Sequence, residues 1–283
     1  MINKKLTLGH SPDPDDAFMF YGMASGLVDC RGYNFEHILR DIQTLNEWAM
    51  AGRLDISAIS FHAYPYVADN YALLPCGASM GDGYGPIIVA KKRLSKDEII
   101  KSRIAIPGKL TSAFLALQLY LNCSEGELNC VVVPFDQIFE TVLSGKADAG
   151  LVIHEGQLTF SREGLVVCED LGVWWKNEND NLPLPLGGNV IHKRIPSDER
   201  KVISAIIKES IQFSLNHRDG AVKYALQFGR GLDLNLADKF IGMYVNHWTV
   251  DYGERGRESI RRFLKKAEER GLIPKFKGLE FVG

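Results

Sequence analysis

The chain has 283 residues, of which 46% are hydrophobic and 24% are charged, and its formal net charge is −2. This composition predicts a folded globular protein of one large or two medium domains. The near-neutral charge, without a basic stripe, excludes a general attraction to nucleic acid or to an anionic membrane surface.

Targeting and redox signals point to the cytoplasm. The first residues lack the apolar segment of a signal peptide, and no apolar run approaches the roughly 20 residues that cross a bilayer. The five cysteines are scattered and form no C-x-x-C pair. This pattern suits a reducing compartment and argues against a disulfide framework or a zinc site. We therefore expect a soluble cytoplasmic protein.

Strand-like apolar runs alternate with helix-like segments along the chain, which is the α/β pattern. Residues 5–10 predict a strand, and the next helix begins after it. Asp13 suits the N-cap of that helix, Pro14 its first position, and Asp15 and Asp16 its positive first turn. Because capping explains these carboxylates, we do not expect a metal site here, and Asp16 is kept as a candidate substrate contact.

One helix–turn–strand unit occurs twice. Residues 45–61 (LNEWAMAGRLDISAISF) align without a gap on residues 138–154 (IFETVLSGKADAGLVIH). In each copy a helix ends at a glycine, a basic residue follows, and an aspartate leads into a strand. The repeat indicates two lobes that arose by duplication, although convergent loop chemistry could produce the same pattern in any parallel sheet.

Two glycine-led strands that end in basic pairs, residues 85–94 and 187–196, support the two lobes. If both are hinge strands, the second lobe spans residues 91–189. It is then inserted into a first lobe made of residues 1–90 and 190–283, whose last part is mostly helical. Ligands in such folds bind at the carboxyl ends of strands, in the cleft between the lobes.

His154 is the candidate for proton transfer. It follows a strand of the second lobe, so it is expected at the cleft, and imidazole exchanges protons near neutral pH. Its counterpart in the first copy of the repeat is Phe61. A zinc motif of the H-E-x-x-H type is excluded, because Leu158 occupies the second histidine position and Gly156 breaks a helix. A histidine in a surface loop is the alternative.

Two further segments offer polar groups to the same cleft. The helix that begins at Thr111 and Ser112 presents free backbone N–H groups, hydroxyls and a positive dipole, which suit a carboxylate or phosphate. The alternative is that Thr111 merely caps the helix. The strand end with Ser57 and Ser60 is a weaker candidate, because small polar residues are common at strand ends.

Four segments together resemble the 1,4-dihydroxy-6-naphthoate synthase family, which acts in the futalosine route to menaquinone. They are HSPDPDDAFMFY (10–21), PGKLTSAFLALQLY (107–120), GLVIHEGQLTF (150–160) and DLGVWWKNENDNLPLPLGGNVI (170–191). The resemblance runs nearly end to end and includes NHWTVDYGERGRESIRRFL (246–264). It implies a type II periplasmic-binding-protein-like fold, an α/β protein of two discontinuous lobes joined by two hinge strands.

The resemblance also implies an activity and a site. Members of the family cleave cyclic dehypoxanthinyl futalosine, a small molecule with a carboxylate, to 1,4-dihydroxy-6-naphthoate without a metal ion or an organic cofactor. The proton acceptor of the family is the histidine of its I-H-E stretch, which is His154 here. The family often has threonine at position 112, and the serine found here keeps the hydroxyl. The substrate contacts fall on two segments, Ala58, Ile59 and Ser60, and Thr111, Ser112 and Ala113.

Several alternatives stay open at this point. A chorismate dehydratase of the same pathway is one rival, against which the I-H-E stretch and the LPLPLGGN loop argue. A non-catalytic solute-binding protein is the other, and the missing signal segment argues against it. Glu155 is expected to face solvent rather than to orient His154. No nucleic-acid or membrane partner is expected, and a homodimer is left open.

Overall fold

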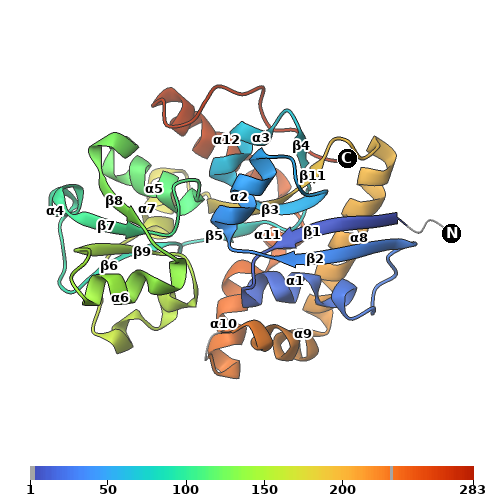
Figure 1. Cartoon of the computed structure of the whole chain (residues 1–283), viewed down its shortest axis with the longest axis horizontal. Coiled ribbons are helices and arrows are strands. Elements are labelled where there is room, and N and C mark those ends of the chain that lie inside the picture. Colours follow the sequence, from blue (N-terminus) through green and yellow to red (C-terminus); the bar gives the residue numbers. More distant parts are fainter. Residues whose placement is uncertain (1–3, 230–231) are drawn as a thin grey trace.

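The structure is a computed structural model that describes residues 4–229 and 232–283, and these form two α/β lobes that lie side by side (Figure 1). The first lobe is built on a six-stranded sheet and the second on a five-stranded sheet. Each sheet combines parallel and antiparallel strand pairs.

The first sheet consists of β1 (Lys4–His10), β2 (Tyr33–Leu39), β3 (Ile56–Ser60), β4 (Tyr71–Leu73), β5 (Ser79–Gly81) and β11 (Leu184–His192). Its strand order is β2-β1-β3-β11-β4, and β5 also pairs with β11. β1 is parallel to β2 and β3, whereas β11 is antiparallel to its partners. Every residue of β3 is buried, as expected for a central strand covered on both faces.

The second sheet consists of β6 (Ile87–Ala90), β7 (Arg103–Ile106), β8 (Asn129–Val132), β9 (Ala149–Val152) and β10 (Val166–Asp170). Its strand order is β10-β6-β9-β7-β8. β7 is parallel to β8 and β9, and β6 is antiparallel to β9 and β10. The order β2-β1-β3-β11 of the first sheet therefore has the same pattern of strand directions as β8-β7-β9-β6 of the second.

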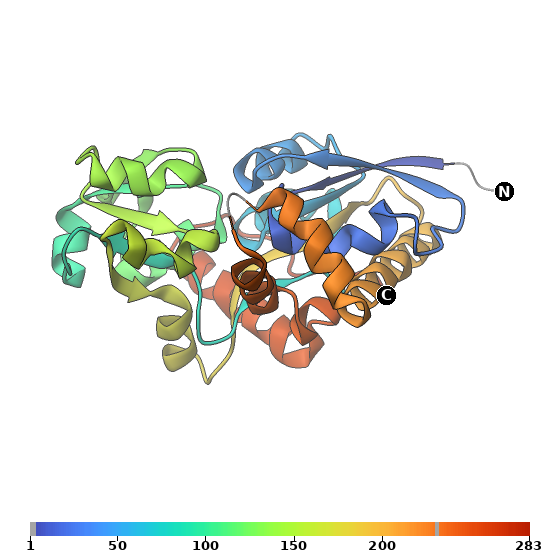
Figure 2. The same cartoon turned by 90° about the horizontal axis from the view of Figure 1, so that it is seen from below.

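Helices cover both sheets. The first lobe carries α1 (Pro14–Ala24), α2 (Ile42–Met50), α3 (Tyr64–Val67), α8 (Ser197–Asn216), α9 (Arg218–Ala225), α10 (Leu234–Tyr244), α11 (His247–Val250) and α12 (Gly253–Glu269). The second carries α4 (Lys96–Lys101), α5 (Ser112–Leu121), α6 (Ile138–Leu143) and α7 (Leu171–Glu178). α1 packs against α8, α9 and α10, and Figure 2 shows these C-terminal helices gathered on the first lobe and along its boundary with the second. No described helix is long and apolar enough to cross a bilayer.

The repeated unit has the same geometry in both lobes, as the sequence predicts. α2 leads through Gly52 into β3, and α6 leads through Gly145 into β9. Both glycines adopt a left-handed conformation, with φ of 64° and 75°, which side chains with a Cβ rarely adopt. The backbone hydrogen bonds around the two turns match position by position.

The aspartate after each turn ties the unit to a neighbouring strand. The Asp55 carboxylate accepts the N–H of Thr7 in β1 at 2.9 Å. The Asp148 carboxylate accepts the N–H of Arg103, at the start of β7, at 2.8 Å. The carboxylate therefore fixes the strand that begins after it beside its parallel partner, β1 in the first sheet and β7 in the second.

The chain crosses between the sheets twice, after β5 and after α7. β6 begins at Ile87 and belongs to the second sheet, and β11 begins at Leu184 and belongs to the first. Both crossings therefore precede the positions 90/91 and 189/190 that the glycine-led strands suggest. Gly85 and Gly172 explain the close packing at the first crossing, since a Cβ on Gly85 would lie 2.8 Å from the backbone nitrogen of Gly172. The residue at which each lobe ends stays a prediction.

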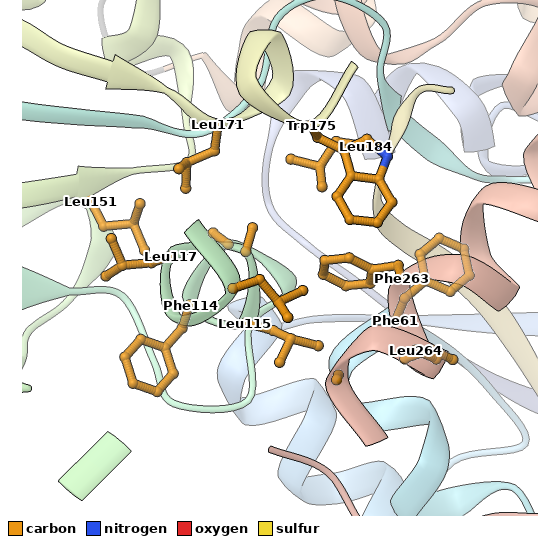
Figure 3. Packing of buried hydrophobic residues seen from close by; sticks show 14 of the residues in the cluster. Phe61, Phe114, Leu115, Leu117, Leu151, Leu171, Trp175, Leu184, Phe263 and Leu264 are labelled. Carbon is orange, nitrogen blue, oxygen red and sulfur yellow. The ribbon is translucent and has the colours of Figure 1, made fainter. Parts of the chain in front are cut away.

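A hydrophobic cluster joins the two lobes on one side (Figure 3). The second lobe contributes Phe114 from α5 and Trp175 from α7, and the first contributes Phe61 and Phe263. The rings of Trp175 and Phe263 meet edge to face with centroids 5.3 Å apart, and the Trp175 indole N–H donates to the Ser259 hydroxyl at 3.3 Å. These buried contacts pack the two lobes against each other on this side.

Candidate active site

A cavity of about 130 Å³ lies between the lobes. Its walls come from the strand ends and helix starts of both lobes. The lining residues include Ser11, Asp13, Asp15 and Asp16 at the start of α1, residues 58–60 of β3, residues 111–113 at the start of α5, Ile153 and Gln157 after β9, residues 186–189 of β11, and Phe240 and Tyr244 of α10.

Most of the substrate contacts expected from the sequence lie on this wall, namely Asp16, Ala58, Ile59, Ser60, Thr111, Ser112 and Ala113. Ser57 is not among the described residues that line the cavity. Its side chain is fully buried inside β3, and its hydroxyl donates to the carbonyl oxygen of Ala58 at 2.9 Å. Ser57 therefore serves the local backbone in this structure.

The start of α5 is arranged as an anion site. The Thr111 hydroxyl accepts the N–H of Phe114 at 3.2 Å and donates to the Gly108 carbonyl at 2.8 Å, so Thr111 caps the helix as predicted. The N–H groups of Ser112 and Ala113 belong to the first turn, where no intrahelical acceptor exists. The first turn carries no acidic side chain. The helix dipole and these N–H groups are therefore available to an anion in the cavity.

His62 supports this helix start from the first lobe. Its backbone N–H donates to the Ser112 hydroxyl oxygen at 3.2 Å, and its Nδ1 lies 3.2 Å from the Thr111 carbonyl oxygen. Burial lowers the pKa of His62 to about 4, although the Thr111 hydrogen bond opposes the shift. The ring is therefore neutral at pH 7 and donates through Nδ1. Since Ser112 accepts from His62, its own hydrogen can point to a ligand.

His62 is not among the residues predicted from the sequence, yet the repeat contains a signal for it. His62 follows Phe61 as Glu155 follows His154, and both of these aligned polar side chains are buried. Ser60 is fixed in a similar way, because its backbone N–H donates to Asn46 Oδ1 at 2.8 Å and its hydroxyl accepts from Asn46 Nδ2 at 3.1 Å.

The start of α1 forms another part of the wall, and it is acidic. Asp16 accepts the Ser11 N–H at 2.6 Å, and the Ser11 hydroxyl donates to Asp13. Asp13 occupies the N-cap position as predicted, but its side chain makes no capping hydrogen bond. The physical reason is that the carboxylate of Asp13 turns back to the Ser11 hydroxyl.

Burial shifts the protonation of these acids. It raises the pKa of Asp16 to about 7. The Ser11 hydrogen bond opposes this shift, and the Asp13 charge adds to it. Burial also raises the pKa of Asp15 well above its ordinary value, together with the charges of Asp16 and Asp13. This wall can therefore hold or release a proton near neutral pH. Among the described residues, no group of three or more His, Cys, Asp or Glu side chains is arranged to hold a metal ion.

His154 lies beside the cavity, not on its lining. It is the N-cap of the 3₁₀ turn η4 (Glu155–Leu158), and its Nδ1 accepts the N–H of Gly156 at 2.9 Å. The ring contacts Phe135 and Phe139, with centroids 5.6 and 5.9 Å away. Ile153 and Gln157, on either side of it in the sequence, do line the cavity.

Glu155 is buried, with 7% of its surface exposed, so the expectation that it faces solvent is wrong. The η4 turn folds it back into the protein directly after β9. Its carboxylate oxygen lies 3.9 Å from His154 Nδ1. Glu155 is therefore near enough to stabilise a positive charge on the imidazole ring.

Several lining residues are not among those predicted from the sequence, and three of them are polar side chains with informative contacts, Gln157, Asn189 and Tyr244. The Tyr244 hydroxyl donates to Gln157 Oε1 at 2.7 Å, and Asn189 Nδ2 donates to the Gly77 carbonyl at 3.1 Å. Asn189 Oδ1 is buried and has no hydrogen-bond partner among the described residues. Asn189 lies in the LPLPLGGN segment, which offered a signal, whereas nothing near Tyr244 in the sequence marks it as a site residue.

Two lobes of mixed sheet around a cleft, crossed twice by the chain, define the class of periplasmic-binding-protein-like folds. The alkanesulfonate-binding protein of Xanthomonas axonopodis pv. citri, bound to MOPS, matches with a TM-score of 0.72 and covers 97% of this chain and 96% of its own, at 12% identity. A Candida albicans protein described as having the generic periplasmic binding protein fold matches with a TM-score of 0.63, covers 99% of this chain and 98% of its own, and is 12% identical. These likenesses show the fold alone, and they confirm the predicted two-lobed fold class.

Sequence comparison then gives the family. The menaquinone biosynthesis family model matches residues 6–269. The 1,4-dihydroxy-6-naphthoate synthase of Thermus thermophilus is 36% identical over 94% of this chain and 95% of its own, and that of Streptomyces coelicolor is 33% identical over 95% of each. A crystal structure of an Archaeoglobus fulgidus protein is 41% identical, with a TM-score of 0.90 over 95% of this chain and 98% of its own. The chain belongs to the menaquinone biosynthesis family, and the resemblance seen in its sequence is confirmed.

Proposed function

We propose that this protein is a carbon–carbon lyase that converts cyclic dehypoxanthinyl futalosine to 1,4-dihydroxy-6-naphthoate in menaquinone biosynthesis. The synthases of Thermus thermophilus and Streptomyces coelicolor support this assignment along nearly their whole length. The observation that carries it is the polarity of the cavity, in which an acid-free helix start faces a cluster of carboxylates.

This polarity gives the substrate one orientation. Its carboxylate binds the N–H groups of Ser112 and Ala113 and the Ser112 hydroxyl, where the α5 dipole is positive. Its polar, sugar-derived part then points to Asp16 and to Asn189, whose Oδ1 can accept a substrate hydroxyl. The reverse orientation would bring the substrate carboxylate against the Asp13 charge, and above about pH 7 against the Asp16 charge, at a cost in Coulomb repulsion.

His154 is the proposed general base. In the described arrangement Nδ1 accepts from Gly156, so Nε2 carries the ring proton. To act as a base through Nε2, the ring takes the Nδ1–H tautomer and gives up the hydrogen bond from Gly156, and the Glu155 carboxylate 3.9 Å away favours a proton at Nδ1. Removal of a substrate proton starts C–C cleavage, and aromatisation of the second ring draws the reaction forward. Closure of the lobes excludes water and holds the reacting atoms in place.

Substrate tests distinguish the alternatives. Purified protein is incubated separately with cyclic dehypoxanthinyl futalosine and with chorismate, and the products are identified by mass spectrometry. We expect 1,4-dihydroxy-6-naphthoate from the first and no conversion of the second. Dehydration of chorismate would identify the sibling enzyme instead, and binding without conversion of either compound would favour a solute-binding protein.

Two variants test the base. His154→Ala should lose turnover about a hundredfold or more while still binding product. His154→Asn should lose as much, although its side chain can still accept the Gly156 N–H as the N-cap of η4. Circular dichroism confirms that both are folded. Full activity in either variant contradicts the assignment of His154 as the base.

We also place the enzyme in the cytoplasm, with a small carboxylate-bearing molecule as its substrate and without a nucleic-acid partner. All five cysteines are free in the structure, which fits a reducing compartment. The net charge of −2 fits the absence of attraction to nucleic acid. Fractionation of native cells with an antibody to the protein tests the location.

A further inference from the structure

Gln157 and Tyr244 form a hydrogen bond between the lobes at the cavity wall. Gln157 lies in η4, which follows β9 of the second lobe, and Tyr244 ends α10 of the first. The Tyr244 hydroxyl donates to Gln157 Oε1 at 2.7 Å. Both residues line the cavity and are buried, with exposed fractions of 9% for Gln157 and 3% for Tyr244.

The other end of the Gln157 amide lacks a partner. Its Nε2 is buried and makes no hydrogen bond to any described residue. Buried amide groups are normally paired, so an unpaired donor at a cavity wall points to a ligand acceptor. Because Tyr244 holds Oε1, the orientation of the amide is set, and the N–H₂ group is the end left for the cavity.

Tyr244 is itself held firmly. Its ring meets Tyr84 edge to face, with centroids 5.8 Å apart, and packs on Phe240 at 5.3 Å. Tyr84 lies in the first crossing between the lobes, and its hydroxyl donates to the Met243 carbonyl. Burial raises the pKa of Tyr244, so its hydroxyl remains a donor at any ordinary pH. Tyr244 therefore presents a fixed donor to the second lobe.

We infer that Gln157 is a substrate-binding residue whose amide N–H₂ donates to an oxygen at the reacting end of the substrate, and that Tyr244 is the positioning residue that aims it. The backbone links Gln157 to the proposed base, because its N–H donates to the His154 carbonyl at 2.9 Å. The oxygen it meets therefore belongs to the reacting, sugar-derived part. The identity of that substrate rests on the proposed function, whereas the geometry of the pair does not.

The pair also couples ligand binding to closure. Its hydrogen bond joins an element of one lobe to an element of the other, so it exists only while the cleft is closed on this side. Opening releases the Gln157 amide from its fixed orientation. The donor is thus preorganised for the substrate in the closed state alone, which lowers the cost of ordering it during reaction.

A double-mutant cycle tests the two roles. Tyr244→Phe removes only the donor that orients the amide, and Gln157→Met removes the amide at nearly constant length. Each should lower kcat/KM about tenfold or more, as expected for a lost buried hydrogen bond. Because Tyr244 acts through Gln157, the double variant should be no slower than Gln157→Met alone. Fully additive losses would overturn the inference.

Tyr64→Phe is the matched control. The Tyr64 hydroxyl is also buried, but it accepts the Glu280 N–H at 3.0 Å within the first lobe, away from the cavity. This variant should keep kcat/KM within about twofold of the wild type. A loss as large as that of Tyr244→Phe would mean that any lost tyrosine hydroxyl weakens the enzyme, and the positioning role would be refuted.

A second measurement separates this inference from the proposed function. In ligand-free protein, Tyr244→Phe should raise hydrogen exchange at the η4 amides about tenfold and leave exchange in β7 unchanged. Unchanged exchange in η4 would refute the positioning role, whatever the enzyme's substrate is. If the wild type converts no futalosine derivative while η4 responds as expected, the proposed function fails and the role of Tyr244 stands.

Discussion

The protonation of Asp16 should make the protein less stable as the pH rises through neutrality. Its pKa lies at about 7 in the folded protein and near 3.8 in the unfolded chain, so the folded state binds this proton more tightly. The stabilisation is fully present below pH 3.8 and is lost as the pH rises through about 7. The difference between the two values corresponds to about 4 kcal/mol of unfolding free energy.

Asp16→Asn isolates this contribution, because asparagine stays neutral and its Oδ1 can still accept the Ser11 N–H that Asp16 accepts at 2.6 Å. The variant and the wild type should be equally stable at pH 4. Above pH 7 the variant should be more stable by about 4 kcal/mol. Part of this difference comes from Asp15, because the variant lacks the Asp16 charge that raises the pKa of Asp15. Urea unfolding followed by circular dichroism at several pH values measures the difference.

Asp82→Asn is a control of opposite sign. Burial opposes the shift, but hydrogen bonds from Lys176 and Trp248 lower the pKa of Asp82. Its stabilisation is present above pH 3.8 and is lost as the pH falls, so Asp82→Asn should be the less stable protein at pH 7. A constant stability difference between Asp16→Asn and the wild type from pH 4 to pH 8 would refute the reasoning about Asp16.

Three further outcomes follow from the site and the fold. Replacing Thr111 and Ser112 together with alanine should raise KM more than it lowers kcat, and an unchanged KM in steady-state assays would place the substrate carboxylate elsewhere. Gly145→Ala should lower the unfolding free energy by about 1 kcal/mol, because φ is 75° there and only the backbone conformation opposes the new Cβ. Gly126→Ala should not lower it, because φ is not positive there and no neighbour lies within 4 Å of the new Cβ. Phe263→Ala should cost about 3–5 kcal/mol in guanidinium unfolding, and a much smaller loss would mean that the shared core does not hold the lobes together.

Local rules explain why the repeated unit could be predicted. A glycine in the left-handed conformation after a helix and an aspartate before a strand act over a few residues, so Gly52 and Asp55 carry their signal in the sequence itself. The same holds for Thr111, whose cap depends on its own helix. The alternation of strands and helices likewise indicates the fold class without any distant contact.

Long-range pairing explains what could not be predicted. The chain crosses to the other sheet just before β6 and just before β11. Their pairing partners, β9 and β3, are far away in the sequence. Glu155 is buried because η4 folds against α10 of the first lobe, a contact that no local pattern encodes. Tyr244 and Gln157 meet for the same reason. The Asp13 side chain makes no capping bond because the hydroxyl of its neighbour Ser11 donates to its carboxylate.

The matching layout of the two lobes also explains why the site has a direction. Each lobe brings the start of a helix to the cleft, α1 after β1 and α5 after β7. In α1 the first turn carries Asp15 and Asp16, so carboxyl groups of the chain itself occupy the positive end of the dipole. In α5 the first turn carries no acid, so the same dipole is available to a ligand. The start of α5 is therefore the one that we propose for the substrate carboxylate.

Ala113→Asp should therefore block the anion site at the start of α5, as Asp15 and Asp16 occupy the start of α1. Ala113 is the second residue of α5, as Asp15 is of α1. The new carboxylate should stabilise the helix by about 0.3–1 kcal/mol, but two carboxylates about 4 Å apart repel by about 4 kcal/mol at an effective dielectric constant near 20. Affinity for 1,4-dihydroxy-6-naphthoate, measured by calorimetry, should fall roughly a hundredfold or more. Ala113→Asn has the same shape without the charge and should lose far less. Equal losses in the two variants would mean that bulk, not charge, governs this position.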